Sequence, residues 1–283
     1  MMANEQQHEY WNGEAGARWA AEDDTMAALL GPVAQELLDY LQPEAGIHAL
    51  DIGCGGGSQS ALLAQHIGEG GEVLGVDISA PMLDIARRRG QPAGAAALSF
   101  LEADAATYPF SAASFDLLFS RFGVMFFDDP IAAFNNMRRA LKPSGRLGFC
   151  CWRAMKDNQW TLLPVQAALR HVPAPESPDP HAPGPFALAD PRHLESILSV
   201  SGFSDIDIAS RDVQLAFGSG GELRTAVAEL MALGPVSRLL ADQPPEILER
   251  VVDDAVPLLE PHYRDGKLML SGAVWFVTGL AGS

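Results

Sequence analysis

The chain has 283 residues, of which 48% are hydrophobic and 19% charged, a composition typical of a globular protein and unlike that of a disordered, collagenous or coiled-coil chain. Nineteen Lys and Arg stand against thirty-six Asp and Glu, so the formal net charge is -17. Such an acidic surface repels nucleic-acid phosphates, and no apolar run approaches the roughly 18 residues of a membrane-spanning helix, so we expect neither nucleic acid nor membrane as a partner.

The first residues, MMANEQQHEYWNGE, are polar and acidic and lack the basic flank and apolar stretch of a signal peptide. The three cysteines are Cys54, Cys150 and Cys151, an odd number without CxxC spacing. Neither a disulfide framework nor a zinc site is therefore expected. These features predict a protein of the reducing cytoplasm.

Apolar residues recur at helical spacing over 23–42, which predicts an amphipathic helix that ends before Pro43. From Ile47 onward short apolar runs alternate with helical patterns, which predicts parallel strands joined by right-handed crossovers in an α/β sheet covered on both faces. Ser79 and Asp129 are expected to cap two of the helices. The expected strands are 47–52, 72–77, 97–103, 115–120 and 146–152, and the expected helices are 58–67, 80–89, 130–141 and 158–170.

Six prolines between positions 173 and 185 predict a surface loop. Beyond it the apolar pattern predicts a helix, a strand, two helices and a last strand. These ranges are 190–202, 206–217, 221–233, 245–260 and 272–278.

The two late helices interrupt what would otherwise be a strand-to-strand hairpin, which indicates an insertion over the sheet. We therefore expect a single domain, 1–283, with a cofactor-binding core of 46–217 and 267–279. An N-terminal helical lid would be 1–42, and an inserted helical cap would be 221–263.

A glycine-rich segment, Asp51-Ile-Gly-Cys-Gly-Gly-Gly57, directly follows the first predicted strand. Four glycines in five residues leave a backbone that a ligand can approach closely, and amides at a helix start favour an anion. The second strand ends in Asp77 and the third in Glu102-Ala-Asp104. Because the carboxyl ends of parallel strands form the ligand crevice and an acid there can bind ribose hydroxyls, this series predicts a ligand that contains adenosine.

Two common nucleotide patterns are absent from the sequence. Ser58 stands where a dinucleotide fingerprint after Gly53-x-Gly55 needs its third glycine, and no Gly-Lys-Ser/Thr of a P-loop occurs. Five other segments match the motifs of a known family in order and spacing. They are ALDIGCGGG (49–57), VLGVDISAPML (73–83), FLEADAATYPF (100–110), FDLLFSRFGVMFFDDP (115–130) and LKPSGRLGFCCW (141–152).

These segments resemble the class I S-adenosylmethionine-dependent methyltransferases, in particular the group similar to ubiquinone/menaquinone-biosynthesis methyltransferases. The likeness covers residues 8–152 and, more loosely, 267–278. It implies a Rossmann-like doubly wound sheet of seven strands in the order 3-2-1-4-5-7-6, with strand seven antiparallel. It also implies S-adenosyl-L-methionine as the cofactor and S-adenosyl-L-homocysteine as the product.

The resemblance further implies which residues hold the cofactor. They are Asp51, Gly53 and Gly55 at its amino-acid half, Asp77 at the ribose, Ile78, Met82, Asp104 and Ala105 around the adenine, and Ser120 and Arg121 beside the sulfonium, with Arg121 a candidate partner of the cofactor carboxylate.

Aromatic rings at the expected rim can attract a sulfonium cation by about 0.5–2 kcal/mol, although each ring could equally pack in the core. Tyr10 and Trp11 are surrounded by polar residues, so we expect them to fold over the cofactor. His262 is the preferred proton acceptor because it lies between the inserted helices and the last strand, where the cap could bring it over the pocket. The expected contacts with the methyl acceptor are Phe122, Phe126, Trp152 and Tyr263.

Two other chemistries are less well supported by the sequence. Tyr263 and Lys267 match the Tyr-x-x-x-Lys spacing of short-chain dehydrogenases, but Asp265-Gly266 between them is a turn signal. The acids near the fourth strand could bind magnesium, but they more simply cap the next helix, so no metal is expected. The residues concerned are Asp128, Asp129, Asn135 and Asn136.

Two functions stay open at this point. The first is methyl transfer to a small-molecule acceptor through an oxygen, nitrogen or carbon nucleophile by in-line displacement. The second is a protein that binds S-adenosylmethionine without transferring methyl, or that catalyses a different reaction. The oligomeric state also stays open, with a homodimer as one outcome.

Overall fold

The structure is a computed structural model, and it describes residues 4–174 and 179–282. The chain divides into two compact units. The first consists of Met1–Cys151, Pro183–Ser210 and Trp275–Ser283, and the second of Trp152–Ala182 and Arg211–Val274.

The strands form one sheet in the order β3-β2-β1-β4-β5-β8-β6, and a short β7 pairs with β8 alone. Strands β1 to β5 pair in parallel along this order. Counted without β7, this is the predicted order 3-2-1-4-5-7-6, which is confirmed. The strands are β1 (His48–Ile52), β2 (Glu72–Asp77), β3 (Ala97–Glu102), β4 (Phe115–Arg121), β5 (Leu141–Trp152), β6 (Ser204–Phe217), β7 (Tyr263–Arg264) and β8 (Lys267–Leu280).

Strand β8 runs antiparallel to β5, as expected for the seventh strand. The amide of Ala281 donates to the carbonyl of Gly145, whereas the amide of Arg153 donates to the carbonyl of Ala273. Residue numbers therefore rise along one strand while they fall along the other.

Helices cover both faces of the sheet in the first unit. The first unit contains α1 (Glu5–Asn12), α2 (Glu14–Ala21), α3 (Asp23–Leu41), α4 (Ser58–Ile67), α5 (Ala80–Arg89), η1 (Gly123–Phe126), α6 (Pro130–Ala140) and α8 (Pro191–Val200). The second unit contains η2 (Met155–Asp157), α7 (Gln159–Ala168), α9 (Leu223–Met231), α10 (Gly234–Leu240), α11 (Pro245–Leu259) and η3 (Glu260–His262).

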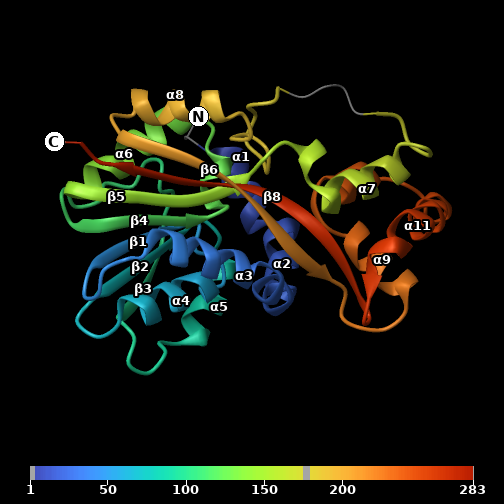
Figure 1. Cartoon of the computed structure of the whole chain (residues 1–283), viewed down its shortest axis with the longest axis horizontal. Coiled ribbons are helices and arrows are strands. Elements are labelled where there is room, and N and C mark those ends of the chain that lie inside the picture. The colour runs from blue at the N-terminus through green and yellow to red at the C-terminus, as the bar shows by residue number, and fades with distance from the viewer. Residues whose placement is uncertain (1–3, 175–178, 283) are drawn as a thin grey trace. The chain divides into compact units, whose positions relative to one another are not determined.

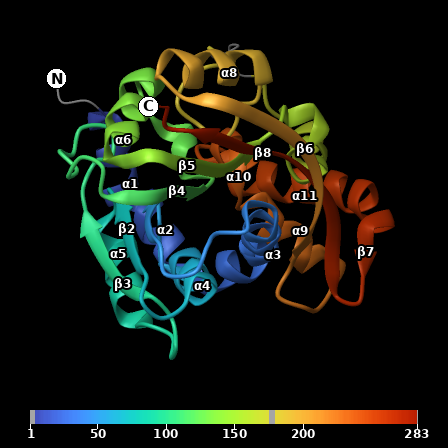
Figure 2. The same cartoon turned by 60° about the vertical axis from the view of Figure 1, so that its left-hand side comes forward.

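Two neighbouring residues of β5 show which helices cover which face. Gly148 and Phe149 point to opposite faces, because side chains alternate along a strand. A Cβ at Gly148 would lie 2.5 Å from a methyl carbon of Leu41 in α3, whereas the Phe149 ring lies 5.7 Å from that of Phe134 in α6. Helix α3 with its neighbour α4 therefore covers one face, and α6 with its neighbour α8 covers the other (Figures 1 and 2).

The second unit has its own packed core. Helix α7 contacts α10 and α11, and α9 also packs against α11. The Trp160 ring lies 5.0 Å from that of Trp152 and 6.2 Å from that of Phe217, and all three rings come from within this unit.

The strands and helices expected between 47 and 152 agree with the structure to within two residues at each end, apart from the start of β5. Strand β5 begins at Leu141 rather than 146, and Ser144 within it has a φ of 66° where the register with β4 shifts. Helix α10 and strand β7 were not expected, and within the expected helical lid of 1–42 the separate helices α1 and α2 were not predicted. Every residue of α1 keeps some exposure to solvent, so the helix has no apolar face to reveal it in the sequence.

Of the predicted proline-rich loop at 173–185, positions 175–178 lie outside the described residues. Its described positions form turns and bends without helix or strand, as expected. Among the helices of the described residues, none combines the length and the apolar character needed to cross a bilayer.

Candidate functional site

The loop between β1 and α4 uses its glycines to pack against the rest of the protein. Gly53, Gly55 and Gly57 have φ values of 67°, 54° and 76°, a left-handed conformation that glycine adopts without steric cost. A Cβ at Gly53 would lie 2.6 Å from the Cα of Gly123, and one at Gly57 would lie 2.9 Å from the Phe100 ring. The protein's own backbone and side chains therefore require these glycines, whatever ligand approaches them.

The first amides of this loop already have acceptors inside the protein. Gly53 and Cys54 both donate to the carbonyl of Val76, at 2.8 and 3.1 Å. Gly55 donates to Oδ2 of Asp77 at 2.7 Å. The expectation of an anion at these amides is therefore restricted to the first turn of α4, where none of the described side chains forms a cap.

Asp77 ends β2 and joins two loops. Its Oδ2 accepts from the Gly55 amide, and its Oδ1 accepts from the Ser79 amide at 2.8 Å. Burial raises the pKa of Asp77, and these backbone donors oppose that shift. A carboxylate offers about four acceptor positions, so ribose hydroxyls can still bind to Asp77.

Asp51 lies within β1 and is fully buried. Its Oδ1 accepts from Gln59 Nε2 at 2.9 Å, and its Oδ2 accepts from Ser60 Oγ at 2.5 Å. Burial raises the pKa of Asp51 to about 7, although the Ser60 and Gln59 hydrogen bonds and the charge of Arg121 lower it. Asp51 therefore titrates near neutral pH.

Arg121 ends β4 and carries an unsatisfied guanidinium. Its Nε and Nη1 are buried and have no hydrogen-bond partner among the described residues. Burial lowers the pKa of Arg121, and the nearby Cys150, Asp51 and Asp23 oppose this shift. Buried donors of this kind are rarely left unpaired, so Arg121 fits a ligand that brings an acceptor.

Arg121 lines a pocket of about 300 Å³ between α3 and α4. The first turn of α4, with its uncapped amides, forms part of the wall. An anionic group in this pocket would meet both the guanidinium and the positive end of α4. Other lining residues are Ala27, Gly31 and Gln35 of α3 and Ser58, Gln59 and Leu62 of α4.

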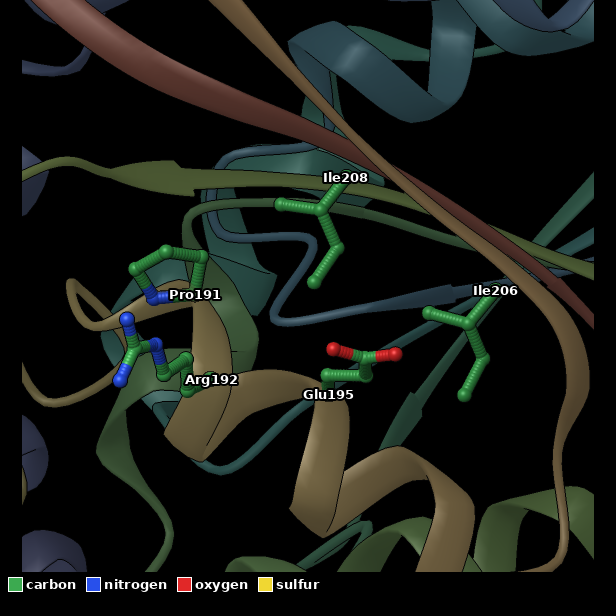
Figure 3. A pocket seen from close by; sticks show the side chains of 5 residues that line it. All are labelled: Pro191, Arg192, Glu195, Ile206 and Ile208. Atoms are coloured by element: carbon green, nitrogen blue, oxygen red, sulfur yellow. The ribbon is translucent and has the colours of Figure 1, made fainter.

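A second hollow in the first unit, of about 180 Å³, lies between α8 and the edge strand β6. Figure 3 shows Ile206 and Ile208 of β6 facing Arg192 and Glu195 of α8 across it. None of the predicted site residues lines this hollow within the described chain. It belongs to the β6 end of the sheet, away from the β1, β2 and β4 loops in the strand order.

Helix α1 connects the loops that follow β2, β3 and β4. At its start, Asn4 donates from Nδ2 to Asp104 Oδ1 at 2.9 Å and accepts at Oδ1 from the Asp128 amide at 2.8 Å. At its end, Asn12 donates to the Ile78 carbonyl and accepts from the Ala80 amide, both at 2.9 Å.

The predicted aromatic residues of the N-terminal segment meet around Trp11. Its ring makes edge-to-face contacts with Tyr10, Trp19 and Phe126, with ring centroids 5.2, 5.9 and 5.4 Å away. The carbonyl of Trp11 accepts from Ser79 Oγ at 2.8 Å. Tyr10 and Trp11, predicted to fold over the cofactor, therefore form one cluster with Phe126, predicted to contact the acceptor, beside the loop after β2.

Met82 and Ala105, both predicted to line the adenine, are buried. The Met82 methyl carbon lies 3.3 Å from the place a Cβ would take at Gly55. The Ala105 carbonyl accepts from Asn136 Nδ2 at 3.0 Å. Both residues therefore adjoin the loops that carry the predicted acids.

Ser120 and Phe122 flank Arg121 at the end of β4. Ser120 Oγ donates to the Ile52 carbonyl at 2.8 Å and accepts from the Gly123 amide at 3.2 Å, so its hydroxyl fixes the neighbouring loops. Phe122 is buried with a φ of 65°, a strained conformation for a bulky side chain.

Trp152, His262 and Tyr263 belong to the second unit. The Tyr263 hydroxyl donates to the Gly221 carbonyl. Tyr263 lies in β7 and Lys267 begins β8, and the two strands pair as a hairpin. The two side chains therefore do not share a helix, which excludes the short-chain dehydrogenase arrangement.

Three of the four residues that could have formed a magnesium cluster have other partners. Asp129 caps α6 by accepting from the Ala132 amide, Asp128 binds Asn4, and Asn136 binds the Ala105 and Tyr108 carbonyls. Within the described residues, no group of three or more His, Cys, Asp or Glu is placed to hold a metal ion.

Sequence reasoning missed several residues that contact the predicted acids or their loops, among them Gln59, Ser60, Asn4 and Asn12. Gln59 and Ser60 could have been found, because the first turn of a helix points back toward the strand that precedes its loop. Asn4 and Asn12 gave no signal, since their partners are distant in the chain and their own surroundings are polar.

Comparison with known proteins identifies the family to which the chain is similar. A family described as a methyltransferase domain matches residues 50–149. The chain is 29% identical over 201 residues to a nocamycin O-methyltransferase of Saccharothrix syringae, covering 68% of this chain and 72% of that protein. It is 33% identical over 154 residues to the aklanonic acid methyltransferase DauC of a Streptomyces species, covering 52% of this chain and 70% of that protein.

The chain is also 31% identical over 110 residues to a demethylmenaquinone methyltransferase of Bacillus velezensis, which is 39% of this chain and 47% of that protein. Among solved structures, a phosphoethanolamine N-methyltransferase of Haemonchus contortus in complex with phosphomonomethylethanolamine and S-adenosylhomocysteine is similar with a TM-score of 0.54 and 21% identity. The match covers 89% of this chain and 53% of that one, so this chain spans about half the length of these last two proteins.

The chain belongs to the S-adenosylmethionine-dependent methyltransferases. The resemblance that the five sequence motifs carry is thereby confirmed.

Asp51→Asn tests whether burial raises the pKa of Asp51. The asparagine side chain keeps the shape of the aspartate but does not titrate, and it can still form hydrogen bonds with Gln59 and Ser60. The pKa of Asp51 is about 7 in the folded protein and 3.8 when the carboxyl group is free of the fold. Between these two pH values the folded state therefore binds a proton that the unfolded chain does not. Its stabilising contribution is complete below the lower value and is lost as the pH rises through 7. We expect the variant to gain stability over the wild type between pH 4 and 7, reaching on the order of 4 kcal/mol above pH 7 in urea unfolding.

Asp116→Asn is the matched control, because the pKa of Asp116 is shifted in the opposite direction. Burial of Asp116 is outweighed by hydrogen bonds from Lys142 and the His48 amide, which leave its pKa below the usual value. Its stabilising contribution is therefore present at neutral pH and lost on acidification, so this variant should be less stable than the wild type at pH 7. A stability difference for Asp51→Asn that does not change with pH would contradict the account.

Proposed function

We propose that the carboxyl edge of β1, β2, β3 and β4 binds S-adenosyl-L-methionine and that the protein transfers its methyl group to a small organic acceptor. One observation carries this proposal: acids end or adjoin three neighbouring strands, while at the end of the next strand Arg121 has buried guanidinium nitrogens without a hydrogen-bond partner among the described residues. A nucleoside that carries a cation and a carboxylate matches this arrangement of charge.

The residues proposed to hold the nucleoside follow from where the loops lie. Asp77 has acceptor positions left for the ribose hydroxyls. Oδ1 of Asp104 accepts from the side-chain NH2 group of Asn4, which supports Asp104 as the acceptor proposed for the adenine amino group. Ile78, Met82 and Ala105 would line the adenine between them.

The residues proposed to hold the amino-acid half lie on the other side of the glycine loop. The backbone at Gly53 and Gly55 and the buried Asp51 would face it. The cofactor carboxylate would satisfy Arg121 in the pocket between α3 and α4, near Ser120. This assignment gives a partner to the buried guanidinium that the protein leaves unpaired.

When bound, the cofactor would supply a methyl group on a positively charged sulfur. An acceptor atom would attack the methyl carbon from the side away from sulfur, and the electrons of the broken carbon–sulfur bond would stay on sulfur. The chain's part is to hold the two reactants in line at about 3 Å and to exclude water. Tyr10, Trp11 and Phe126 form one aromatic cluster beside the loop after β2, and the face of such a ring is proposed to attract the sulfonium cation.

We also propose that residues 1–42 act as a lid on this site. Asn4 and Asn12 bind α1 to the loops that carry Asp104 and Ile78, so these hydrogen bonds would have to open for a nucleoside to enter or leave.

Asn12→Ala should then speed dissociation of S-adenosylhomocysteine in stopped-flow measurements, and an unchanged rate would exclude the lid.

The acceptor is proposed to be a small molecule with an oxygen nucleophile, as the name of the nocamycin O-methyltransferase states for that relative. The residues proposed to choose it are Phe122 and Phe126 of the first unit and Trp152 and Tyr263 of the second. The high acidity of the chain supports the absence of a nucleic-acid partner.

Turnover tests the proposed reaction directly. Protein incubated with methyl-labelled S-adenosylmethionine and a panel of phenols, enols and carboxylic acids should form S-adenosylhomocysteine and methylated acceptor in equal amounts. Asp77→Asn is the control against a contaminating enzyme, since its NH2 group would face one of the two backbone amides that Asp77 now accepts from and should weaken cofactor binding. An acceptor that is converted while the label stays in S-adenosylmethionine would instead favour the second function, a reaction without methyl transfer.

Arg121→Gln tests the carboxylate assignment when it is combined with decarboxylated S-adenosylmethionine. We expect the variant to bind S-adenosylmethionine roughly tenfold to a hundredfold more weakly, the loss expected for one hydrogen bond to a charged group. The affinity for the decarboxylated analogue should stay within about twofold of the wild type, measured by calorimetry, because the lost partner is absent from that ligand. Equal weakening for both ligands would mean that Arg121 acts only through the fold.

His262→Ala tests the proposed proton acceptor. A positioned base contributes about a hundredfold or more to a rate, so we expect kcat to fall by that order. The dissociation constant of S-adenosylhomocysteine should not change, because His262 is not proposed to touch the cofactor. An unchanged kcat across pH 6 to 9 would exclude this role.

A further inference from the structure

Asp23 and Arg89, which are not among the predicted site residues, meet at the glycine-rich loop. Asp23 begins α3 and Arg89 ends α5, 66 residues away. Arg89 Nη2 lies 2.6 Å from Asp23 Oδ2, and Arg89 Nε donates to the carbonyl of Gly56 at 3.0 Å. One guanidinium therefore joins the start of α3, the end of α5 and the loop.

The carboxylate of Asp23 fills the space beside Gly56. Asp23 is only 7% exposed, and a Cβ at Gly56 would lie 2.0 Å from its Oδ1. Any side chain at position 56 would therefore displace Asp23. Because a buried carboxylate needs a paired cation, Asp23 in turn depends on Arg89.

The two halves of the loop are held by different parts of the protein. Strand β2 holds the first half, through the Val76 carbonyl and the Asp77 carboxylate. The carbonyl of Gly56, which leads into the first turn of α4, is held by Arg89. The conformation of the second half should therefore follow the ion pair rather than β2.

We propose that Asp23 and Arg89 are positioning residues of the cofactor site, whose ion pair holds Gly56 and the entry into α4 in the conformation that binds the cofactor. The proposal rests on the proposed function, because it takes the loop to contact the cofactor. Asp23 also begins the helix that follows α1 and α2, so the same pair couples the N-terminal segment to the loop.

Two substitutions separate the ion pair between Arg89 and Asp23 from the hydrogen bond between Arg89 and Gly56. Arg89→Gln removes the charge, whereas Arg89→Lys keeps a cation for Asp23 but has no Nε group to bind Gly56. Arg87→Gln is the matched control, because Arg87 lies on the same helix and pairs with Asp84 at 3.4 Å at the surface. The readouts are the dissociation constant of S-adenosylhomocysteine and the hydrogen exchange of the amides of residues 56–58 in ligand-free protein.

We expect Arg89→Gln to weaken binding by roughly tenfold to a hundredfold, the loss of one hydrogen bond to a charged group, and to speed exchange at 56–58. Arg89→Lys should recover part of both losses, and Arg87→Gln should resemble the wild type. Should Arg89→Gln fail to fold because Asp23 is left unpaired, Asp23→Asn with Arg89→Gln provides a neutral pair for the same comparison.

Equal exchange at 56–58 in Arg89→Gln and Arg87→Gln would overturn the proposal. Faster exchange with unchanged affinity would also overturn it, because the loop would then move without effect on the site. A wild-type protein that binds no S-adenosylhomocysteine would contradict the proposed function, and the exchange comparison would still decide whether the pair holds the loop.

Discussion

The carboxylate of Asp77 holds together the two loops on which the candidate site is built. One oxygen binds the amide of Gly55 in the loop after β1, and the other binds the amide of Ser79 in the loop after β2. Hydrogen bonds to an ionised acceptor are stronger than those between neutral groups. The two loops therefore keep one relative arrangement, and the acid that fixes them is also the acid available to a ribose.

The sign of the charges around these loops decides which nucleotide the edge can accept. The first amides of the glycine loop are already bonded, one of them to the carboxylate of Asp77, so a pyrophosphate at these amides would meet a carboxylate rather than free donors. The sulfonium of S-adenosylmethionine would meet the same carboxylate favourably. The buried guanidinium of Arg121, which has no hydrogen-bond partner for two of its nitrogens among the described residues, is the proposed partner of the cofactor's carboxylate.

The sequence predicted the parts of this protein that depend on neighbours along the chain. Helix α4 and strand β2 have the expected bounds because local features of the sequence define them: glycines flank the helix, and an apolar run forms the strand. Contacts between distant segments could not be predicted, among them the bonds of Asn4 to the β3 and β4 loops. Ser79 combines both cases: it stands at the expected N-cap position, but its hydroxyl binds the Trp11 carbonyl instead of capping α5.

Calorimetric titration of ligand-free protein tests the central claim that this acidic edge selects a cationic nucleoside. S-adenosylmethionine and S-adenosylhomocysteine should each bind with one-to-one stoichiometry and should exclude one another, whereas ATP and NAD should give no binding heat and displace neither. Binding of ATP or NAD in competition with S-adenosylhomocysteine, or no heat from either sulfur ligand, would contradict the account.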